Sequence, residues 1–342
     1  MNYPFDLQVA WFLLVGVLFV GYAVLDGFDL GIGMLHLLAK GDMERRTLLN
    51  SIGPVWDGNE VWLITGGGAL FAAFPEVYAT VFSGFYLPFY LLLTALIFRA
   101  VAIEFRSKHE SARWRTNWDV SFAVASLVIA LLAGVALGNM IVGIPLDKDF
   151  EYTGGFFNLL NPYSLLVGIT TVSLFAMHGS IYAVLKTEGE LQEKAKRWIS
   201  STTVFFGVCY LVTTLATLVF VPNMLNNMKA APVFMLVPVV NLLAIIGIFY
   251  TTRTGQEMQA FILSCLNIAC LLALFGIGLF PNLVTNSVAG LPSVTIRNSS
   301  STEASLTTMF TIALLGMPFV LAYTSAIYWV FRGKVNTKHL HY

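Results

Sequence analysis

The stretch Gly53-Pro54-Val55-Trp56-Asp57-Gly58-Asn59-Glu60-Val61-Trp62-Leu63 places two carboxylates, an amide and two indoles inside a segment that is otherwise apolar. A second such stretch, Ala23-Val24-Leu25-Asp26-Gly27-Phe28-Asp29-Leu30-Gly31-Ile32-Gly33, lies one apolar segment earlier. Ionised groups in hydrocarbon are costly, so acids inside a spanning helix are by default functional or paired. The role of these four acids is the central question that the sequence raises.

The remainder of the chain is strongly apolar. Of its 342 residues, 57% are hydrophobic and only 11% are charged. Because soluble proteins carry about 25% charged residues, this composition indicates an integral membrane protein. The 19 basic and 19 acidic residues balance, so net charge indicates no polyanionic partner such as a nucleic acid. No soluble domain and no internal repeat is visible, and we expect a single transmembrane domain over residues 1–342.

Nine apolar segments are each long enough to cross a bilayer, which takes about 20 residues. They are residues 8–37, 48–74, 77–105, 118–143, 162–186, 199–221, 232–251, 257–280 and 307–332. The sequence therefore predicts an all-α, polytopic bundle of about nine transmembrane helices.

Basic residues are distributed unevenly between the two sets of connections. All but three of the 19 lysines and arginines fall on one side, and only Lys148, Lys229 and Arg297 fall on the other. Cytoplasmic loops of membrane proteins carry the excess of Lys and Arg. The crowded side is therefore predicted to be cytoplasmic, which places the N-terminus outside and the C-terminus inside.

The intramembrane acids lie in the predicted cytoplasmic halves of their helices. At about 1.5 Å per residue, Asp57 and Asp29 each lie about 14 Å, and Asp26 about 18 Å, from the cytoplasmic ends. Glu60 lies one turn deeper than Asp57 on the same face. We expect the first two helices to be antiparallel neighbours that hold the two acid pairs at matching depth. The outer halves carry essentially no charge, a pattern that suits proton entry from the cytoplasm alone.

A structural interpretation of the same residues stays open. Asp26 and Asp29 could cap a broken helix at the neighbouring glycines, or pair with Arg99, which we predict to be a structural counter-charge. The candidates for a proton pathway are Asp57, Asp29, Asp26 and Glu60, together with the adjacent Trp56.

The sequence contains no haem-ligand pattern. His178 lies in a membrane segment and could ligate a haem iron, but a haem held between membrane helices takes a pair of axial ligands. No second histidine lies at comparable depth, so we expect His178 to pack or to form hydrogen bonds. Phosphate-binding loops, nucleophile elbows and zinc spacings are also missing, and no catalytic residue is assigned.

Residues 21–33 and 56–63 strongly resemble subunit II of cytochrome bd-type quinol oxidases. The resemblance covers nearly the whole chain and is densest in its first half. Further strings that resemble the family are Arg45-Arg46, Asn50-Ser51, Gly67-Gly68-Ala69-Leu70-Phe71-Ala72-Ala73, Phe82-Ser83-Gly84-Phe85-Tyr86, Phe105-Arg106-Ser107-Lys108 and Asn158-Leu159-Leu160-Asn161-Pro162.

The resemblance implies a multi-pass protein of the bacterial plasma membrane, within a terminal oxidase that reduces dioxygen to water. In that family, electrons pass from membrane quinol through two b-type haems and, commonly, a d-type haem. All haem ligands and the quinol-oxidising loop belong to subunit I. This chain is therefore expected to ligate no cofactor and to stabilise its haem-bearing partner.

The resemblance also implies a cytoplasmic proton route at the Trp56-Asp57 motif. Some relatives carry glutamine where this chain has Glu60, so the family assigns no universal protonation role to that residue. Membrane quinol and lipids are the other expected partners. A quinone bound to this chain and a small single-helix accessory subunit stay open.

Two other functions stay open from the residues alone. A purely structural partner subunit would use its acids only to brace helices. A proton- or sodium-coupled secondary transporter would bind its ion at acids near the midplane, but such proteins usually show inverted repeats and access from both faces. Neither feature is visible in this sequence.

Overall fold

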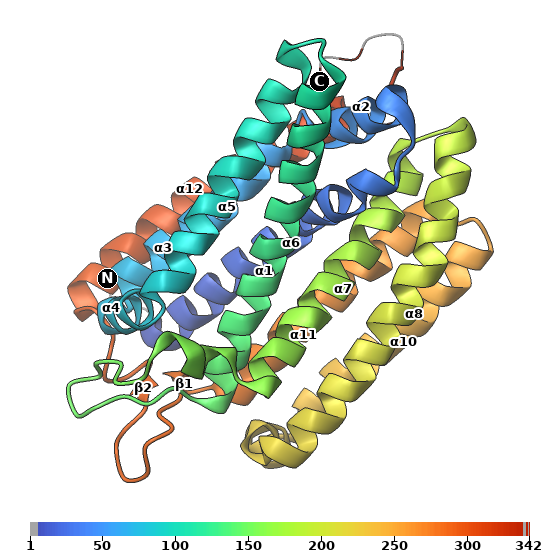
Figure 1. Ribbon diagram of the computed structural model, residues 1–342. Helices are drawn as coiled ribbons and strands as arrows, with labels where there is room; N and C mark the ends of the chain where they lie inside the picture. Colours follow the sequence, from blue (N-terminus) through green and yellow to red (C-terminus); the bar gives the residue numbers. More distant parts are fainter. Residues whose placement is uncertain (1–5, 338–339, 341) are drawn as a thin grey trace.

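The computed structural model describes residues 6–337, 340 and 342, and it is almost entirely helical (Figure 1). Eight helices in this part of the chain are long and apolar enough to cross a membrane. They are α1 (Leu7–Leu35, continued by η1, His36–Leu38), α5 (Tyr86–Phe105, continued by η2, Arg106–Lys108), α6 (Ala112–Val142), α7 (Pro162–Lys186), α8 (Gly189–Phe220), α10 (Leu236–Arg253, preceded by η5, Pro232–Met235), α11 (Glu257–Leu279) and α12 (Glu303–Val330). The predicted all-α, polytopic fold is confirmed.

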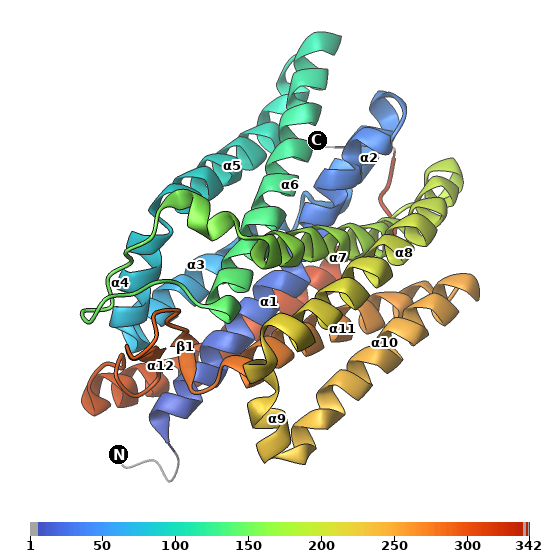
Figure 2. The same ribbon diagram turned by 60° about the horizontal axis from the view of Figure 1, so that its bottom comes forward.

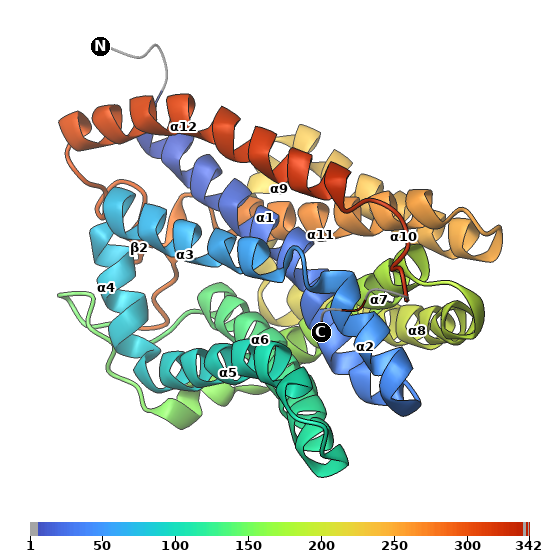
Figure 3. The ribbon, with the colours of Figure 1, turned by 90° about the horizontal axis from the view of Figure 1, so that it is seen from above.

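The predicted second segment, 48–74, is not one continuous helix. α2 (Gly41–Ile52) ends before Gly53-Pro54-Val55, and α3 (Trp56–Ala73) begins after this break. Proline lacks the backbone N–H that would continue the helical hydrogen bonds, so the break falls at Pro54. α3 packs beside α1 in the bundle (Figure 3) but is not one of the eight apolar spans, because its first turns carry the polar motif.

The predicted third segment, 77–105, is also divided. α4 (Pro75–Gly84) follows directly on α3, and α5 begins after Phe85. Pro75 occupies the first position of α4, where its missing N–H costs no helical hydrogen bond. α4 runs across one end of the bundle between α3 and α5 (Figure 3). The spanning part of this segment is therefore α5 alone.

α7 lies in the middle of the bundle, against α1, α6, α8 and α11 (Figure 2). Helices in a membrane associate through close van der Waals packing, which small residues allow. A Cβ on Gly31 would lie 2.1 Å from the Phe175 carbonyl oxygen, and one on Gly179 would lie 2.5 Å from the Gly31 backbone. α1 runs unbroken past its glycines, so Asp26 and Asp29 do not cap a broken helix.

The residues of the predicted cytoplasmic connections meet at one end of the bundle. Ion pairs at this end join Arg115 to Asp42 (Nη1–Oδ2, 2.9 Å), Lys194 to Glu44, and Lys334 to Glu257 (Nζ–Oε2, 3.9 Å). At the opposite end, Arg297 contacts Asp6 next to the start of α1. Connections that gather alternately at the two ends of the bundle agree with helices that cross the bilayer in alternating directions. Which end faces the cytoplasm stays a prediction from the basic residues.

The connections at the opposite end contain short elements. These are η3 (Phe156–Leu160), η4 (Pro222–Leu225), α9 (Asn226–Ala230), and the antiparallel pair β1 (Asn282–Val284) and β2 (Val294–Thr295). The two long connections, 143–161 and 280–302, pack on each other, since the Ile144 N–H donates to the Thr285 carbonyl at 3.0 Å. Together they close that end of the bundle between α4 and α11 (Figure 1).

Candidate functional site

The four acids singled out in the sequence occupy different environments. Asp26 and Asp29, on α1, are completely buried. Glu60, on α3, has a side chain that is only 18% exposed. Asp57 lies in the first turn of α3 and is exposed. The structure thus separates a buried group of three acids from one acid at the surface of the chain.

Arg99 of α5 is the cation of the buried group. Its Nη1 donates to Asp26 Oδ2 at 2.8 Å, and its Nη2 donates to Asp26 Oδ1. This bidentate arrangement is the strongest geometry that an arginine and a carboxylate can adopt. Arg99 Nη1 also lies 3.7 Å from Glu60 Oε2, and Nη2 lies 4.0 Å from Asp29 Oδ2. Three carboxyl groups therefore surround one guanidinium.

Asn59 connects the buried acids to a third helix. Its Nδ2 donates to Asp29 Oδ2 at 2.7 Å, and its Oδ1 accepts a hydrogen bond from the Tyr328 hydroxyl of α12 at 2.8 Å. The sequence reasoning missed both roles. Asn59 could have been noticed in the sequence, because its amide stands between the two acids of one motif. Tyr328 could not, because it lies 269 positions away and nothing in the sequence marks it. We call Asp26, Asp29, Asn59, Glu60 and Arg99 the Arg99 cluster.

The Arg99 cluster contains more acid than base. Asp29 Oδ1 and Glu60 Oε2 are buried and have no hydrogen-bond partner in the described part of the chain. Uncompensated negative charge in a low-dielectric interior is costly, and protonation removes it. One guanidinium balances one carboxylate, so the cluster is expected to hold protons on its remaining carboxyl groups. Its chemistry is that of a site that can accept and release a proton.

Asp57 is not part of this cluster, which corrects the predicted matching depth of the two acid pairs. It follows the break before α3 rather than lying nine residues inside a continuous helix. A helix N-terminus favours a negative charge at this position. Glu60 lies three positions further on, on the same side of α3. Trp56 is buried beside Asp57 and packs into the central core.

A second buried ion cluster lies at the end of the bundle that carries the basic residues. Asp119 of α6 accepts hydrogen bonds from His36 Nε2 at 2.6 Å, from Arg45 Nη1 at 2.8 Å and from Arg106. Arg106 also donates to Asp42 at 3.0 Å. We call these five residues the Asp119 cluster. It ties together α1, α2, α5 and α6 at their ends.

His178 of α7 forms the hydrogen bonds expected of it. Its Nε2 lies 3.0 Å from the Val24 carbonyl oxygen, which only accepts, so Nε2 carries the proton. Its Nδ1 lies 2.7 Å from Ser264 Oγ. The ring also stacks on Phe261 at 5.2 Å between centroids. His178 thus joins α7 to α1 and α11, and both its nitrogens are engaged.

Metals and haems need particular groupings of ligand side chains. Within residues 6–337, 340 and 342, no group of three or more His, Cys, Asp or Glu side chains is placed to hold a metal ion. The sequence candidate for an iron ligand, His178, uses both ring nitrogens in hydrogen bonds to protein groups.

Membrane-length helices around a buried, acid-rich cluster define a polytopic integral membrane protein. Residues 7–331 match the family described as cytochrome bd terminal oxidase subunit II. The chain belongs to this family. It is therefore a subunit of an oxidoreductase complex in a bacterial membrane. Membership of this family also implies a partner, subunit 1.

Two relatives match over nearly their whole length. The chain is 37% identical to cytochrome bd-I ubiquinol oxidase subunit 2 of Escherichia coli K12, over 98% of this chain and 96% of the relative. It is 36% identical to cytochrome bd ubiquinol oxidase subunit 2 of Bacillus subtilis, over 97% and 98%. A chain of the bd oxidase from Geobacillus thermodenitrificans has the same fold, with a TM-score of 0.79 at 16% identity, covering 95% of this chain and 98% of that one.

Proposed function

We propose that this subunit supplies protons to the oxygen-reducing centre of its partner, through Asp57, Glu60 and the buried Arg99 cluster. In this proposal the haems and the site of quinol oxidation belong to subunit 1. The names of the relatives, ubiquinol oxidases, support quinol as the electron donor. The present chain stabilises the haem-bearing subunit and takes up protons at the end of the bundle that carries the basic residues.

The observation that carries the proposal is the excess of carboxyl groups around one guanidinium. Both hydrogen bonds of Arg99 go to Asp26, which leaves Asp29 and Glu60 each with a buried oxygen that has no hydrogen bond. A purely structural ion pair needs one acid for one base. Additional carboxyl groups in the membrane interior are typical of proton relays.

The arrangement along α3 supports a route into this cluster. Asp57 is exposed at the start of the helix, and Glu60 lies one turn further with its side chain against Arg99. A proton accepted at Asp57 has a second carboxyl group on the same side of the same helix as its next acceptor. Glu60 is therefore the link between the surface acid and the buried acids.

Proton uptake and release on opposite sides would make the oxidase electrogenic. Reduction of dioxygen to water consumes one proton for each electron, and oxidation of a quinol releases the same number. If the consumed protons enter through this subunit from the cytoplasm and the quinol protons leave outside, charge is separated without a pump. The predicted orientation of the chain supports this direction of uptake.

The test is the Asp57→Asn variant of the intact oxidase, with oxygen consumption and haem content measured separately. We expect turnover per haem to fall about tenfold or more, since a positioned proton-transfer group contributes about 10²–10⁴-fold. Glu76→Gln is the matched control, because Glu76 is an exposed acid at the start of α4. Normal turnover of Asp57→Asn with full haem content would remove Asp57 from the route.

A second candidate function is that of a structural brace alone, favoured by the bidentate pair between Arg99 and Asp26. In that case Asp57→Asn and Glu60→Gln would leave turnover per haem unchanged. Asp26→Asn would instead reduce the amount of assembled oxidase and its haem content. The ratio of turnover to haem content therefore distinguishes the two functions.

A further inference from the structure

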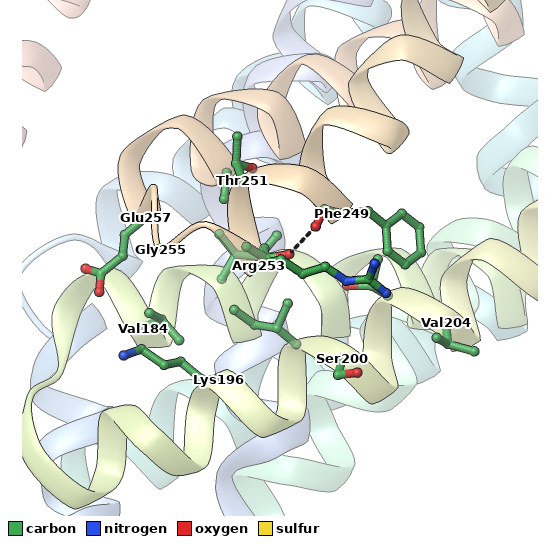
Figure 4. A pocket seen from close by; sticks show the side chains of 14 residues that line it. Val184, Lys196, Ser200, Val204, Phe249, Thr251, Arg253, Gly255 and Glu257 are labelled. Carbon is green, nitrogen blue, oxygen red and sulfur yellow. Dashed lines mark hydrogen bonds between the residues drawn. The ribbon is translucent and has the colours of Figure 1, made fainter.

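A cavity of about 150 Å³ lies between α8 and α10, with α7 and the start of α11 behind it (Figure 4). It is located at the end of the bundle that carries the basic residues, away from both ion clusters. Its apolar lining consists of Ile181, Val184, Ile199, Val204, Phe249 and Ala260. No residue of the Arg99 or Asp119 cluster contributes to it.

Two cations line the cavity from different helices. Arg253 is the last residue of α10. Its guanidinium forms no ion pair or hydrogen bond with any described residue. Lys196 of α8 pairs with Glu193 at 2.7 Å, and their side chains are 44% and 61% exposed. A pair as exposed as this is weak, so Lys196 can exchange Glu193 for another anion. Figure 4 shows Lys196 and Arg253 on the two helices that flank the cavity, with the charged end of Lys196 on the side of Glu257 and that of Arg253 on the side of Phe249.

One acid also lines the cavity, and its charge is engaged elsewhere. Glu257 accepts a hydrogen bond from Gln192 at 2.8 Å and lies 3.9 Å from Lys334. The ends of α10 and α11 meet here with opposite dipoles, which largely cancel. The net charge of the lining therefore comes from Arg253 and Lys196. It is positive and favours an anion.

One residue of this lining has a buried hydroxyl without a hydrogen-bond partner. Thr203 of α8 is 2% exposed, and its Oγ1 has no hydrogen-bond partner in the described part of the chain. A buried polar group left without a partner is costly, and such groups usually have a ligand or a water. Ser200 lines the cavity one turn earlier on α8. Both hydroxyls can donate to the oxygens of a bound anion.

The cavity is continuous with an apolar surface. α8 packs mainly on α7 and α10 mainly on α11, so α8 and α10 scarcely touch each other. Val204 lines the cavity and is 55% exposed, and Val208 on the next turn of α8 is 57% exposed. In a membrane, such a surface faces acyl chains. A free inorganic anion would not use this surface, whereas a lipid would.

We propose that this cavity binds the phosphate group of an anionic phospholipid. Arg253 binds the phosphodiester oxygens, Lys196 adds positive charge to the same lining, Thr203 and Ser200 donate hydrogen bonds to the phosphodiester, and an acyl chain lies along α8. Basic pockets between membrane helices near the cytoplasmic surface bind such headgroups. Arginine suits this task because its planar group pairs with phosphate through two hydrogen bonds. The proposal is independent of the proton route.

The test uses the intact oxidase in detergent with a phosphatidylglycerol that carries a diazirine near its headgroup. A phosphatidylcholine with the same diazirine is the neutral comparison. After irradiation, digestion and mass spectrometry, we expect phosphatidylglycerol to label residues 196–204 and 249–260 severalfold more than phosphatidylcholine does. Millimolar inorganic phosphate should leave this labelling unchanged.

Variants sharpen the assignment. Arg253→Gln should lower the labelling by phosphatidylglycerol about fivefold, the effect of one basic residue on an anionic lipid. Thr203→Val should lower it by a smaller factor. Arg197→Gln is the matched control, since Arg197 is exposed on α8 and does not line the cavity; it should leave labelling as in the unaltered oxidase.

Several outcomes would overturn the proposal. Equal labelling by the two lipids would show that charge is not recognised. Displacement by inorganic phosphate would indicate a free-anion site, and cross-links from these segments to the partner subunit would indicate a protein interface. Equal labelling of Arg253→Gln and Arg197→Gln would exclude Arg253 from the site. The comparison of the two lipids in the unaltered oxidase needs no variant to assemble.

Discussion

The Arg99 cluster and the Asp119 cluster are both buried and both built from arginine and aspartate, yet they differ in their charge balance. In the Asp119 cluster, one carboxylate accepts four hydrogen bonds, from His36, Arg45 and Arg106. In the Arg99 cluster, one guanidinium lies within 4.0 Å of three carboxyl groups, and two of their oxygens have no hydrogen bond. The first arrangement satisfies its central acid, whereas the second leaves acids free to bind protons.

Under the proposed function, this difference assigns a separate role to each cluster. A carboxylate that is fully paired gains nothing from a proton and therefore acts as a clamp between helices. A carboxylate without a full set of donors gains from protonation, so it can take part in transfer. Changes in the Asp119 cluster should therefore affect assembly and stability, and changes in the Arg99 cluster should also affect turnover.

The largest effect is expected from Arg99→Gln, which removes the cation of the Arg99 cluster. Three carboxyl groups would then share a buried site without a counter-charge, and breaking such a pair costs about 3–5 kcal/mol. Thermal unfolding of the intact oxidase, followed by haem absorbance, measures the loss. Arg113→Gln, at an exposed position on α6, is the control. Equal stability of the two variants would contradict the central position of Arg99.

Asp119→Asn should be the next most severe change. It removes the charge that orients His36, Arg45 and Arg106, and hydrogen bonds to charged groups contribute about 1.5–3 kcal/mol each. The oxidase should therefore assemble in lower amount and unfold at lower temperature. Turnover per assembled haem should stay normal, because this cluster is a clamp. A specific loss of turnover would show that the Asp119 cluster also handles protons.

Asp29→Asn should show the opposite pattern. Because Asp29 Oδ1 lacks a hydrogen-bond partner, replacing the carboxyl group by an amide should change stability by no more than about 1 kcal/mol. Turnover per haem should fall if Asp29 takes part in proton transfer. Oxygen consumption and thermal unfolding on the same preparation separate these effects. If Asp29→Asn and Asp119→Asn behave alike, the functional contrast between the clusters is wrong.

A smaller effect is expected from Tyr328→Phe, which removes the hydrogen bond from α12 to Asn59. The expected loss of stability is about 1 kcal/mol, the typical contribution of one buried hydrogen bond. Tyr323→Phe is a matched control on the same helix, since Tyr323 is 68% exposed. Thermal unfolding should separate the two variants, and identical curves would show that Asn59 is positioned without Tyr328.

The smallest effect concerns Glu44, which joins α2 to Lys194 of α8 at the end of the bundle. Burial raises the pKa of Glu44, but hydrogen bonds from Lys194 and from the Lys40 N–H outweigh burial and lower that pKa below its ordinary value. Because its pKa is lowered in the folded protein, ionised Glu44 stabilises the fold at pH values above its ordinary pKa of 4.5. This stabilisation disappears as the pH falls through the lowered pKa.

Glu44→Gln should therefore cost less than about 1 kcal/mol at neutral pH, as is usual for partly exposed pairs. The difference in unfolding temperature from the unaltered oxidase should shrink in acid and in high salt. Glu190→Gln, which changes an exposed acid at the start of α8, serves as the control. If the difference in unfolding temperature grew in acid, the stated direction of the Glu44 pKa shift would be wrong.

The sequence by itself determined the class of protein and the residues that matter most. Composition and the length of the apolar segments predict the membrane bundle, because burial in lipid requires long runs of apolar side chains. The two polar motifs stand out because charge inside such runs is rare. Arg99 was a candidate partner for Asp26 for the same reason, and the structure places them in contact.

Only the tertiary structure decided how these residues are grouped. Asp119 and His36 are 83 positions apart, and Asn59 and Tyr328 are 269 apart, so no local spacing predicts their contacts. A helix that is apolar on every side also shows no periodicity from which its inward face can be read. Which acids are buried, which one is exposed and which oxygens lack a hydrogen bond follow from packing between helices. That packing gives the two clusters the different charge balances on which the proposed function rests.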